Sequence, residues 1–595
     1  MKGSTYVAKF LSAIGADNVY LVQGGACAFM LDEVAKLPEM KYTCFQHEQG
    51  AAMAADAVWR VNGGLGVTMC TSGPGASNLI TGIACGYYDS IPSLHICGQV
   101  NGKEVAQYRG AKVRQAGFQQ MDIVSIVKPV SKYAVAVTNA QELKHELKRC
   151  IEEAFTGRMG PVLIDIPMDV QTEDVGDELL LPDMKLLREC ANQHWPVEGL
   201  DTPAQAASAI NEFFKDSERP LVVFGAGPGL AGSHEILESW LVQQNIPFVA
   251  SWSALSFFNH NINGYIGHFG VYGNRGGNFA IQNADKILVL GSRLDNRQRS
   301  GNPSTFAPSA KLMVLDIDAE ELYKYDPAQY TSIPFDFREL DTLLTDITVN
   351  MTGTSEWQDY LQGIKSRYFN KDTSTYSKSN GTMSPYQAVE KMISLLDSDA
   401  IMATDAGANH CWVYQSFYRN HKQNLMTSSG HYAMGYSVPS MIGAALSSPG
   451  YQCVSFNGDG GVQMNIQELQ TIKEYKLDVK VVVFNNHCLG MIKQFQDSYM
   501  NSRYEATNQG LGPGNPDFSK IADAYGMDYA HVESLDDITD ELFKPGSRLI
   551  EIAIDQGTII EPKLEMGRGI NDQFPYLTDD EFAAENKFVT YKRFK

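Results

Sequence analysis

Short apolar runs and longer helix-like stretches alternate along this chain in three successive blocks. Runs of four to eight apolar residues bounded by turn residues are typical of buried strands. The runs lie at Asn18–Val22, Gly66–Cys70, Ser93–Cys97 and Pro161–Ile166 in the first block, at Leu221–Gly225, Pro247–Ala250, Lys286–Leu290 and Lys311–Asp316 in the second, and at Ala400–Thr404, Gln452–Phe456, Val479–Asn485 and Arg548–Ile554 in the third. This alternation predicts an α/β fold with three doubly wound parallel-sheet domains.

Two polar stretches separate the blocks and set the expected domain boundaries. Residues 173–202 are polar and contain proline, and residues 350–383 are rich in Ser, Thr, Gly and Asn. We interpret both as linkers. The predicted domains are therefore an N-terminal domain of residues 1–172, a central domain of residues 203–349 and a third domain of residues 384–560. A polar tail, 561–595, is placed to wrap over a neighbouring surface.

Composition excludes several classes of protein. Hydrophobic residues make up 44% of the chain and charged residues 20%, which suits a packed globular protein. The net charge of −21 repels nucleic acid and anionic membranes, so we expect neither as a partner. Residues 1–15 lack the features of a secretory signal, and no window nears the length of a membrane span, so a cytoplasmic location is expected.

A Gly-Asp-Gly motif and an Asn-Asn pair each follow a predicted strand of the third block. Gly458–Gly460 and Asn485-Asn486 are separated by 24 residues. Taken alone, the Gly-Asp-Gly motif could be a tight turn and the Asn-Asn pair a loop. Both, however, fall at strand carboxyl ends, the edge of an open sheet where ligands bind. Magnesium prefers oxygen ligands, so we expect it to be held by Asp459, Asn486 and the main-chain carbonyl of Cys488.

This spacing resembles the signature of thiamine diphosphate-dependent enzymes, and most of the chain looks like the acetolactate synthase branch of that family. The resemblance implies pyrimidine-binding, central and diphosphate-binding domains, with thiamine diphosphate and Mg²⁺ as cofactors. The segments that carry it are Gln23–Ala26, Thr71–Asn78, Gly407–Trp412 and Ser428–Gly430. By the resemblance, the cofactor-binding residues are Gly24, Gly73, Asn78, Asn409, His410, Ser429, Met434, Gly458, Gly460, Gly461, Leu489, Gly490 and Met491.

The same resemblance assigns the catalytic residues. Glu48 matches the family glutamate that hydrogen-bonds the pyrimidine ring and activates the cofactor, a task that needs a shielded carboxyl. On its own, a Glu in a first helical turn is also a common cap. Gly25 lies in the glycine turn beside the pyrimidine. Gln119, in Phe118–Gln120, matches a residue on the substrate side and is a candidate contact for the acceptor.

Two departures from acetolactate synthases concern the substrate. Gln120 stands where the family usually has Glu, and the segment 101–117 forms a longer basic loop with Lys103, Arg109, Lys112 and Arg114. Such a loop is either a solvated surface or a site for an anionic acceptor. The segments Gly225–Gly229 and Gly291–Arg297 of the central domain occur in relatives with and without flavin. They are therefore compatible both with FAD binding and with its absence.

The resulting hypothesis is a carboligase that decarboxylates pyruvate or a related 2-oxo acid and transfers the two-carbon unit to a carbonyl acceptor. The alternatives are a simple 2-oxo acid decarboxylase, a carboligase for a larger anionic acceptor such as a nucleotide sugar, and a non-catalytic subunit. The presence of Glu48, Asp459 and Asn486 argues against the last. Since the family builds its site across a subunit interface, a homodimer or homotetramer is expected.

Overall fold

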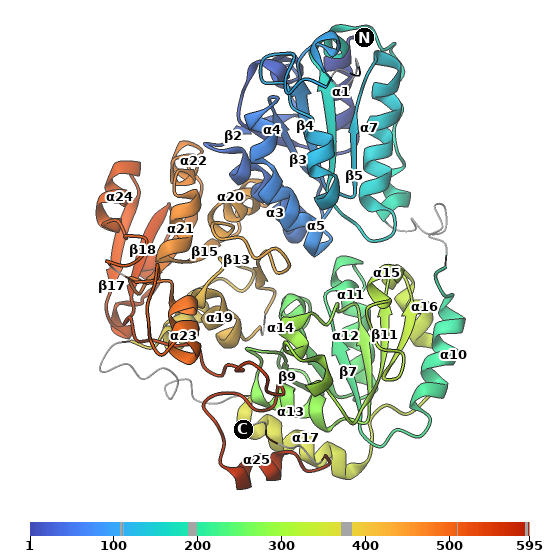
Figure 1. Cartoon of the computed structure of the whole chain (residues 1–595), viewed down its shortest axis with the longest axis vertical. Coiled ribbons are helices and arrows are strands. Elements are labelled where there is room, and N and C mark those ends of the chain that lie inside the picture. The colour runs from blue at the N-terminus through green and yellow to red at the C-terminus, as the bar shows by residue number, and fades with distance from the viewer. Residues whose placement is uncertain are drawn as a thin grey trace.

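The computed structural model describes residues 1–106, 110, 112–188, 199–369, 383–419, 421–508, 510–589 and 593. Within these residues three six-stranded sheets, parallel throughout, combine with interleaved helices into three α/β domains (Figure 1). The predicted fold class is confirmed.

The N-terminal sheet has the strand order β2-β1-β3-β4-β6-β5. Its elements are α1 (Gly3–Ala13), β1 (Asn18–Leu21), α2 (Ala28–Ala35), β2 (Lys41–Cys44), α3 (Glu48–Asn62), β3 (Gly66–Cys70), α4 (Pro74–Asn78), α5 (Ile80–Asp89), β4 (Ser93–Gln99), α6 (Ile123–Val127), β5 (Tyr133–Ala136), α7 (Ala140–Phe155), β6 (Val162–Pro167) and α8 (Met168–Thr172). The chain order reverses between β1 and β3, and ligands of open α/β sheets bind beyond such a point. The turn after β1 meets the loop after β3 there, since a Cβ on Gly24 would lie 2.5 Å from Thr71 Cβ.

The middle sheet has the order β12-β11-β10-β7-β8-β9, so its reversal lies between β7 and β10. Its elements are α10 (Pro203–Phe214), β7 (Pro220–Phe224), α11 (Gly227–Leu230), α12 (His234–Gln243), β8 (Phe248–Ala250), β9 (Tyr265–His268), α13 (Arg275–Asn283), β10 (Lys286–Leu290), α14 (Asn296–Arg299), β11 (Lys311–Asp316), α15 (Ala319–Leu322), β12 (Tyr330–Pro334), α16 (Leu340–Thr345) and α17 (Ser355–Tyr368).

The C-terminal sheet repeats the topology of the N-terminal one, in the order β14-β13-β15-β16-β18-β17. Its elements are α18 (Pro385–Leu395), β13 (Ile401–Thr404), α19 (Ala408–Ser416), β14 (Asn424–Met426), α20 (Ser437–Ser447), β15 (Cys453–Gly458), α21 (Asp459–Val462), α22 (Glu468–Glu474), β16 (Val479–Asn485), α23 (Gly490–Tyr499), α24 (Phe518–Tyr525), β17 (Asp528–Val532) and β18 (Arg548–Ala553). The reversal falls between β13 and β15, so the loops after these strands meet at one edge.

Helix α17 lies inside the segment predicted as the second linker and packs on the middle domain. Its N-cap Thr354 accepts a hydrogen bond from the Trp357 amide (3.2 Å). The Trp357 side chain is fully buried, and its Nε1 donates to the carbonyl of Pro220 (3.0 Å). The segment predicted as a linker therefore contains a helix that one buried tryptophan anchors to the middle domain. The remaining domain boundaries stay predictions.

The C-terminal tail lies over the middle domain, and its helix α25 (Asp579–Glu585) lies beside α17 (Figure 1). Asn278 Nδ2 donates to the carbonyl of Ile570 (2.8 Å), and Gln573 Nε2 donates to the carbonyl of Gly273 (2.9 Å). Phe582 is buried in the same hydrophobic cluster as Trp357. These contacts fasten the tail to α13 and α17.

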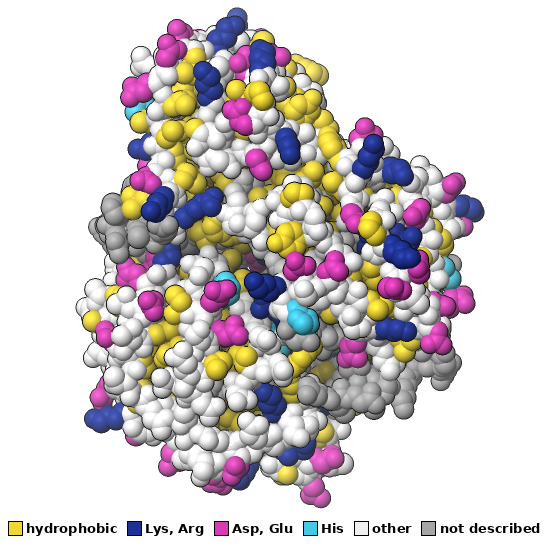
Figure 2. Space-filling model, turned by 180° about the vertical axis from the view of Figure 1, so that it is seen from behind, with side chains coloured by type: hydrophobic (Ala, Val, Ile, Leu, Met, Phe, Trp, Pro, Cys, Tyr) yellow, Lys and Arg dark blue, Asp and Glu magenta, His cyan; other side chains and the backbone are white. Residues whose placement is uncertain are grey.

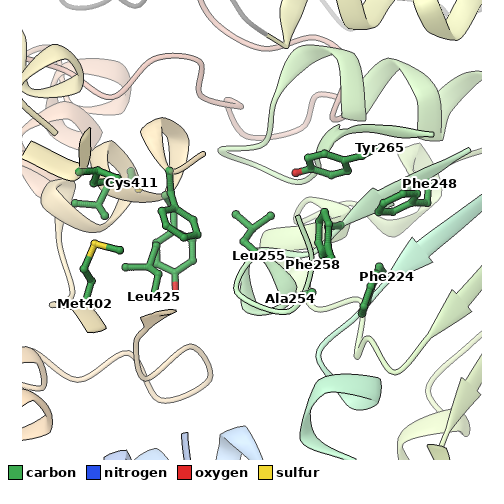
Figure 3. Packing of buried hydrophobic residues seen from close by; sticks show 14 of the residues in the cluster. Phe224, Phe248, Ala254, Leu255, Phe258, Tyr265, Met402, Cys411 and Leu425 are labelled. Atoms are coloured by element: carbon green, nitrogen blue, oxygen red, sulfur yellow. The ribbon is translucent and has the colours of Figure 1, made fainter. Parts of the chain in front are cut away.

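The three domains pack directly on one another. Helices α3 and α20 cross at small residues, since a Cβ on Gly443 would overlap the backbone of Ala54. The middle and C-terminal domains share one hydrophobic cluster, in which Leu255 faces Leu425 (Figure 3). Such close packing fixes the domains relative to one another.

On the face shown in Figure 2, acidic and basic side chains are interspersed. In the part of the chain that the structure describes, no helix has both the length and the apolar character to cross a bilayer.

Candidate active site

Asp459 starts α21 at the carboxyl end of β15. Its side chain is buried, with 3% of the residue exposed. Oδ1 accepts a hydrogen bond from the amide of Gly460 (2.7 Å), and Oδ2 accepts one from Asn515 Nδ2 (2.7 Å). Burial raises the pKa of Asp459, an effect that a cation would oppose.

Asn486 and Cys488 follow β16, the strand beside β15. The pairing of Gly458 with Phe484 brings both strand ends to the same edge. Asn486 is buried and its Oδ1 accepts a hydrogen bond from the Cys488 amide (3.2 Å). Burial raises the pKa of the Cys488 thiol to about 12, so this residue has only its main-chain carbonyl to offer a hard cation.

Asn515 belongs to this edge although no sequence motif marked it. Its Nδ2 donates to Asp459 Oδ2 and also to Asn485 Oδ1 (3.1 Å). Its Oδ1 accepts from Gln463 Nε2 (3.3 Å). Among the described residues no three His, Cys, Asp or Glu side chains gather to form a metal cluster. A magnesium ion here would therefore be held by one carboxylate together with amide and main-chain oxygens, the set predicted from the sequence.

Asn409 joins the two strand ends at the reversal point. Its Nδ2 donates to the carbonyls of Asp405 (3.0 Å) and Phe456 (3.2 Å), so it ties the end of β13 to β15. Among the described residues, neither its buried Oδ1 nor Asp405 Oδ2 has a hydrogen-bond partner. Unpartnered buried polar atoms at a strand edge are typical of a site that receives a ligand.

His410 is buried in an aromatic cage of Trp252, Tyr414 and Tyr432. Burial lowers its pKa well below the usual value, so the imidazole is neutral. The Thr404 hydroxyl lies 2.9 Å from Nδ1. If that hydroxyl is the donor, the other ring nitrogen carries the proton that a phosphate contact needs.

Met434, Gly460 and Leu489 come together at the centre of the edge. A Cβ on Gly460 would lie 3.8 Å from Met434 Cε and 2.8 Å from Leu489 Cδ2. A Cβ on Gly490 would lie 2.7 Å from Asn486 Nδ2. Met491 is half-buried at the start of α23. Glycine at 460 thus keeps space beside Met434, and glycine at 490 leaves room for the Asn486 side chain.

At position 461, glycine is required by the packing of Asp405. A Cβ there would overlap the Asp405 carboxylate. Asp405 Oδ1 in turn accepts a hydrogen bond from the Tyr436 amide (3.0 Å) beside Met434. The absence of a side chain at Gly461 therefore helps to place Met434.

Glu48 begins α3, where the His47 side chain accepts a hydrogen bond from the Gln49 amide (3.1 Å) as the N-cap. The Glu48 residue is 7% exposed, and its Oε2 accepts from Asn78 Nδ2 (2.9 Å). Asn78 therefore orients Glu48. The predicted Gly25 lies on the turn after β1, where a Cβ would meet no atom of the described part of the chain within 4 Å.

The start of α3 packs on the C-terminal domain of the same chain. Gln49 Nε2 donates to Asn465 Oδ1 (3.3 Å), and Asn465 Nδ2 donates to the carbonyl of Gly435 (2.8 Å). Glu468 accepts hydrogen bonds from the main-chain amides of Gln46 (3.3 Å) and His47 (3.1 Å). The Glu48 side and the Met434 side are therefore neighbours.

These residues fit a diphosphate cofactor and its cation, because one edge combines a buried carboxylate, amide oxygens, glycines and unpartnered polar atoms. Family models agree. Residues 1–126 match the N-terminal TPP binding domain of thiamine pyrophosphate enzymes, residues 207–340 their central domain, and residues 405–550 their C-terminal TPP binding domain. The chain belongs to the thiamine pyrophosphate enzymes. Thiamine pyrophosphate and thiamine diphosphate are the same compound.

Curated relatives of this thiamine pyrophosphate enzyme span nearly its whole length. The acetolactate synthase large subunit of Lactococcus lactis is 31% identical over 593 residues, 98% of each chain. The large subunit of acetolactate synthase isozyme 2 of Escherichia coli is 29% identical, and the alignment covers 97% of this chain and 100% of that subunit. The acetolactate synthase of Arthrospira platensis is 34% identical over 87% of each chain. The resemblance stated from the motifs is thereby confirmed.

The segment around Gln119 packs on the loop that carries Asn78. Gly73 and Gln119 both have positive φ, 64° and 63°. A Cβ on Gly73 would lie 2.6 Å from the carbonyl oxygen of Gln119. A non-glycine residue in this backbone region is strained, and such strain concentrates at functional sites. Gln119 thus lies beside the loop that orients Glu48.

The two departures from acetolactate synthases differ in position. Gln120 is buried, and its Oε1 accepts from the Ala116 amide (3.1 Å), so it braces the loop. Phe118 is 83% exposed, and Lys112 and Arg114 are exposed as well. Arg109 lies outside the described residues.

The glycines of the middle-domain turn are accounted for by packing. The amide of Gly227 donates to the carbonyl of Gly291 (3.0 Å), and a Cβ on Gly227 would lie 2.7 Å from Gly291 Cα. A Cβ on Gly229 would overlap the ring of Phe257. These glycines let two loops approach and need no nucleotide to explain them, so FAD stays a prediction.

Proposed function

We propose that this enzyme is an acetolactate synthase-type carboligase. Its substrates would be pyruvate or a related 2-oxo acid, which loses carbon dioxide, and a carbonyl acceptor for the two-carbon unit. The observation that carries the proposal is the buried Glu48 carboxylate, which Asn78 orients at the start of α3. The full-length similarity to acetolactate synthases supports it.

When bound, thiamine diphosphate supplies a carbon nucleophile that adds to ketones and accepts the electrons released by decarboxylation. The chain's residues would hold and prepare it. Asp459, Asn486 and the Cys488 carbonyl would hold Mg²⁺ and through it the diphosphate. Glu48 would hold a proton at its carboxylate for the pyrimidine ring, and burial would keep water from competing.

On the acceptor side, Gln119 would bind the incoming carbonyl compound through its side-chain amide. The exposed ring of Phe118 lies next to it in the chain and would cover an apolar part of the substrate. Binding of the acceptor separates a carboligase from a simple decarboxylase, in which a proton takes the acceptor's place. Gln119 is therefore the residue on which the choice between these reactions depends.

A second candidate function is carboligation to a larger anionic acceptor. Lys112 and Arg114 are exposed on the loop that precedes Phe118, and guanidinium groups recognise phosphate and carboxylate. In this alternative the loop would bind an acceptor such as a nucleotide sugar. Arg114→Ala would then raise the KM for the anionic acceptor more than the KM for pyruvate. Equal changes in both would leave the loop as a solvated surface.

The deciding experiment measures carbon dioxide release and carbon–carbon product separately. Pyruvate is supplied alone, then with 2-oxobutanoate, then with anionic carbonyl compounds, and the products are identified by mass. An acetohydroxy acid supports the proposal, acetaldehyde indicates the simple decarboxylase, and no turnover indicates a non-catalytic subunit.

Two further expectations have direct tests. An absorbance spectrum of the purified protein detects FAD. Sedimentation distinguishes the predicted homodimer or homotetramer from a monomer. The cytoplasmic location stays a prediction.

A further inference from the structure

A buried carboxylate in the N-terminal domain has no part in the chemistry described so far. Asp165 lies on β6 and is 3% exposed. Its Oδ2 accepts a hydrogen bond from Gln99 Nε2 on the neighbouring β4 (2.9 Å), whereas Oδ1 has no partner among the described residues. Burial raises the pKa of Asp165 to about 7, and the Gln99 hydrogen bond opposes that rise. A carboxyl this poorly paired is costly to bury, so a function is needed to explain it.

Gln99 connects Asp165 to the loop that contains Met121. Its Nε2 also donates to the carbonyl oxygen of Met121 (2.9 Å), and its Oε1 accepts from the Val100 amide (3.0 Å). Gln99 is 1% exposed. Both ends of its side-chain amide are thus engaged, and the side chain forms a rigid link from Asp165 to the backbone at Met121.

Met121 ends the segment that carries Gln119. That segment is held in a strained conformation, with Gln119 at a φ of 63° and its carbonyl pressed against Gly73. Strained backbone persists only where the surroundings fix it from several sides. The Gln115 side chain, which donates to the Gln120 carbonyl (3.1 Å), holds the segment from within, and the link to Asp165 holds it from the sheet.

We infer that Asp165 is a positioning residue that, through Gln99 and the Met121 carbonyl, fixes Gln119 for the acceptor. The inference rests on the proposed function, in which Gln119 binds the acceptor. Asp165 acts on the Gln119 segment through Gln99 and not by direct contact. Its loss should therefore weaken acceptor binding and leave the decarboxylation of pyruvate unchanged.

The test compares Asp165→Ala with the wild type in two assays, carbon dioxide release from pyruvate and formation of the carbon–carbon product. The acceptor KM should rise about tenfold, the usual effect of losing one buried hydrogen bond, while carbon dioxide release changes less than about twofold. Asp165→Asn keeps an oxygen that accepts from Gln99, so it should restore most of the acceptor affinity.

Ser93→Ala is the matched control. Ser93 is buried on the same β4 strand and its hydroxyl lies 2.9 Å from His95 Nε2, on the part of the strand away from the Gln119 segment. This variant should keep the acceptor KM of the wild type. If Asp165→Ala does not fold, Gln99→Met removes the same link with little change in volume and should show the same selective loss.

An unchanged acceptor KM in Asp165→Ala would overturn the inference, as would a parallel fall in both assays. A wild-type enzyme that releases no carbon dioxide from pyruvate would instead refute the proposed function. The two failures are therefore distinguishable.

Discussion

The carboxylate of Asp89, at the end of α5, accepts hydrogen bonds from the main-chain amides of Ser429 and Gly430, both at 2.7 Å. The N-terminal domain thereby holds the C-terminal loop that precedes Met434. Arg60 Nη2 lies 2.8 Å from Asp89 Oδ2 and keeps the carboxylate in place. Two amide donors on one buried carboxylate form a strong pair of charge-assisted bonds.

Asp89→Ala should therefore weaken thiamine diphosphate binding by about tenfold or more, since hydrogen bonds to charged groups are worth about 1.5–3 kcal/mol. Calorimetric titration of the cofactor in excess Mg²⁺ measures the loss. Asp89→Asn retains one acceptor oxygen and should give an intermediate affinity. Wild-type affinity in Asp89→Ala would show that the loop needs no support from the N-terminal domain.

Glu48→Gln should leave cofactor binding nearly intact and cut turnover by about 10²–10⁴-fold, because the carboxylate that exchanges the proton is gone. Asn78 can still donate to the amide oxygen of the introduced glutamine, so the variant keeps the hydrogen bond and loses only the proton exchange. The measurement is kcat for carbon dioxide release, with cofactor affinity by titration alongside. Glu39→Gln, at an exposed position, is the control and should keep full activity. Rapid turnover in Glu48→Gln would remove Glu48 from the mechanism.

The interior strands of each sheet could be predicted from the sequence, and the edge strands could not. The apolar runs correspond to the four inner strands of every sheet, most of whose residues are buried. The edge strands β2, β5, β9, β12, β14 and β17 are not among these runs, although β5 (Tyr-Ala-Val-Ala) is itself apolar. In β2 and β17 several residues are exposed, and β14 has only three residues, so no continuous apolar signal exists.

The candidate site shows the same division between local and long-range information. Motifs such as Gly458–Gly460 are contiguous, so their place at a strand end follows from the sequence. Asn515 and Asp89 reach the site from segments far from the motifs they contact, 56 residues from Asp459 and 340 from Ser429. Only the tertiary fold creates those pairs, and neither residue lies in a motif of its own.

Asp459→Ala should abolish the Mg²⁺-dependent part of cofactor binding, since it removes the carboxylate that would hold the cation at this edge. Calorimetry with and without Mg²⁺ measures that part. Cys488→Ser is the matched control, because the ligand there is the main-chain carbonyl and the buried thiol is dispensable to it. A loss of Mg²⁺ dependence in Cys488→Ser would mean that the side chain takes part after all.

Asn515→Ala should weaken Mg²⁺ binding without removing a ligand. Its Nδ2 orients the Asp459 carboxylate, and partners of this kind are typically worth about 10–100-fold in metal affinity. Titration of Mg²⁺ in the presence of cofactor gives the affinity. Glu505→Gln, at an exposed position of the same loop, is the control and should keep the Mg²⁺ affinity of the wild type. An Mg²⁺ affinity in Asn515→Ala equal to that of the wild type would show that Asp459 is oriented without Asn515.

Glu468 should make the stability of the protein depend on pH. Its carboxyl is completely buried, and burial raises its pKa from 4.5 to about 7, although hydrogen bonds from Thr471, Gln46 and His47 oppose the rise. Between these two pH values the folded chain keeps a proton that the unfolded chain releases. The contribution to stability is therefore full below pH 4.5, and it is lost as the pH rises to about 7.

The loss amounts to at most about 3 kcal/mol from this group. Urea unfolding at a series of pH values gives the free energy of unfolding for the wild type and for Glu468→Gln. The variant cannot ionise, so its stability should fall less steeply between pH 4.5 and 7, the interval set by the Glu468 pKa values. Asp165 and Asp405, whose pKa values burial also raises to about 7, remain in both proteins and cancel in the comparison. Parallel pH curves for the two proteins would show that Glu468 is already ionised in the folded chain, held by the two amides that precede Glu48.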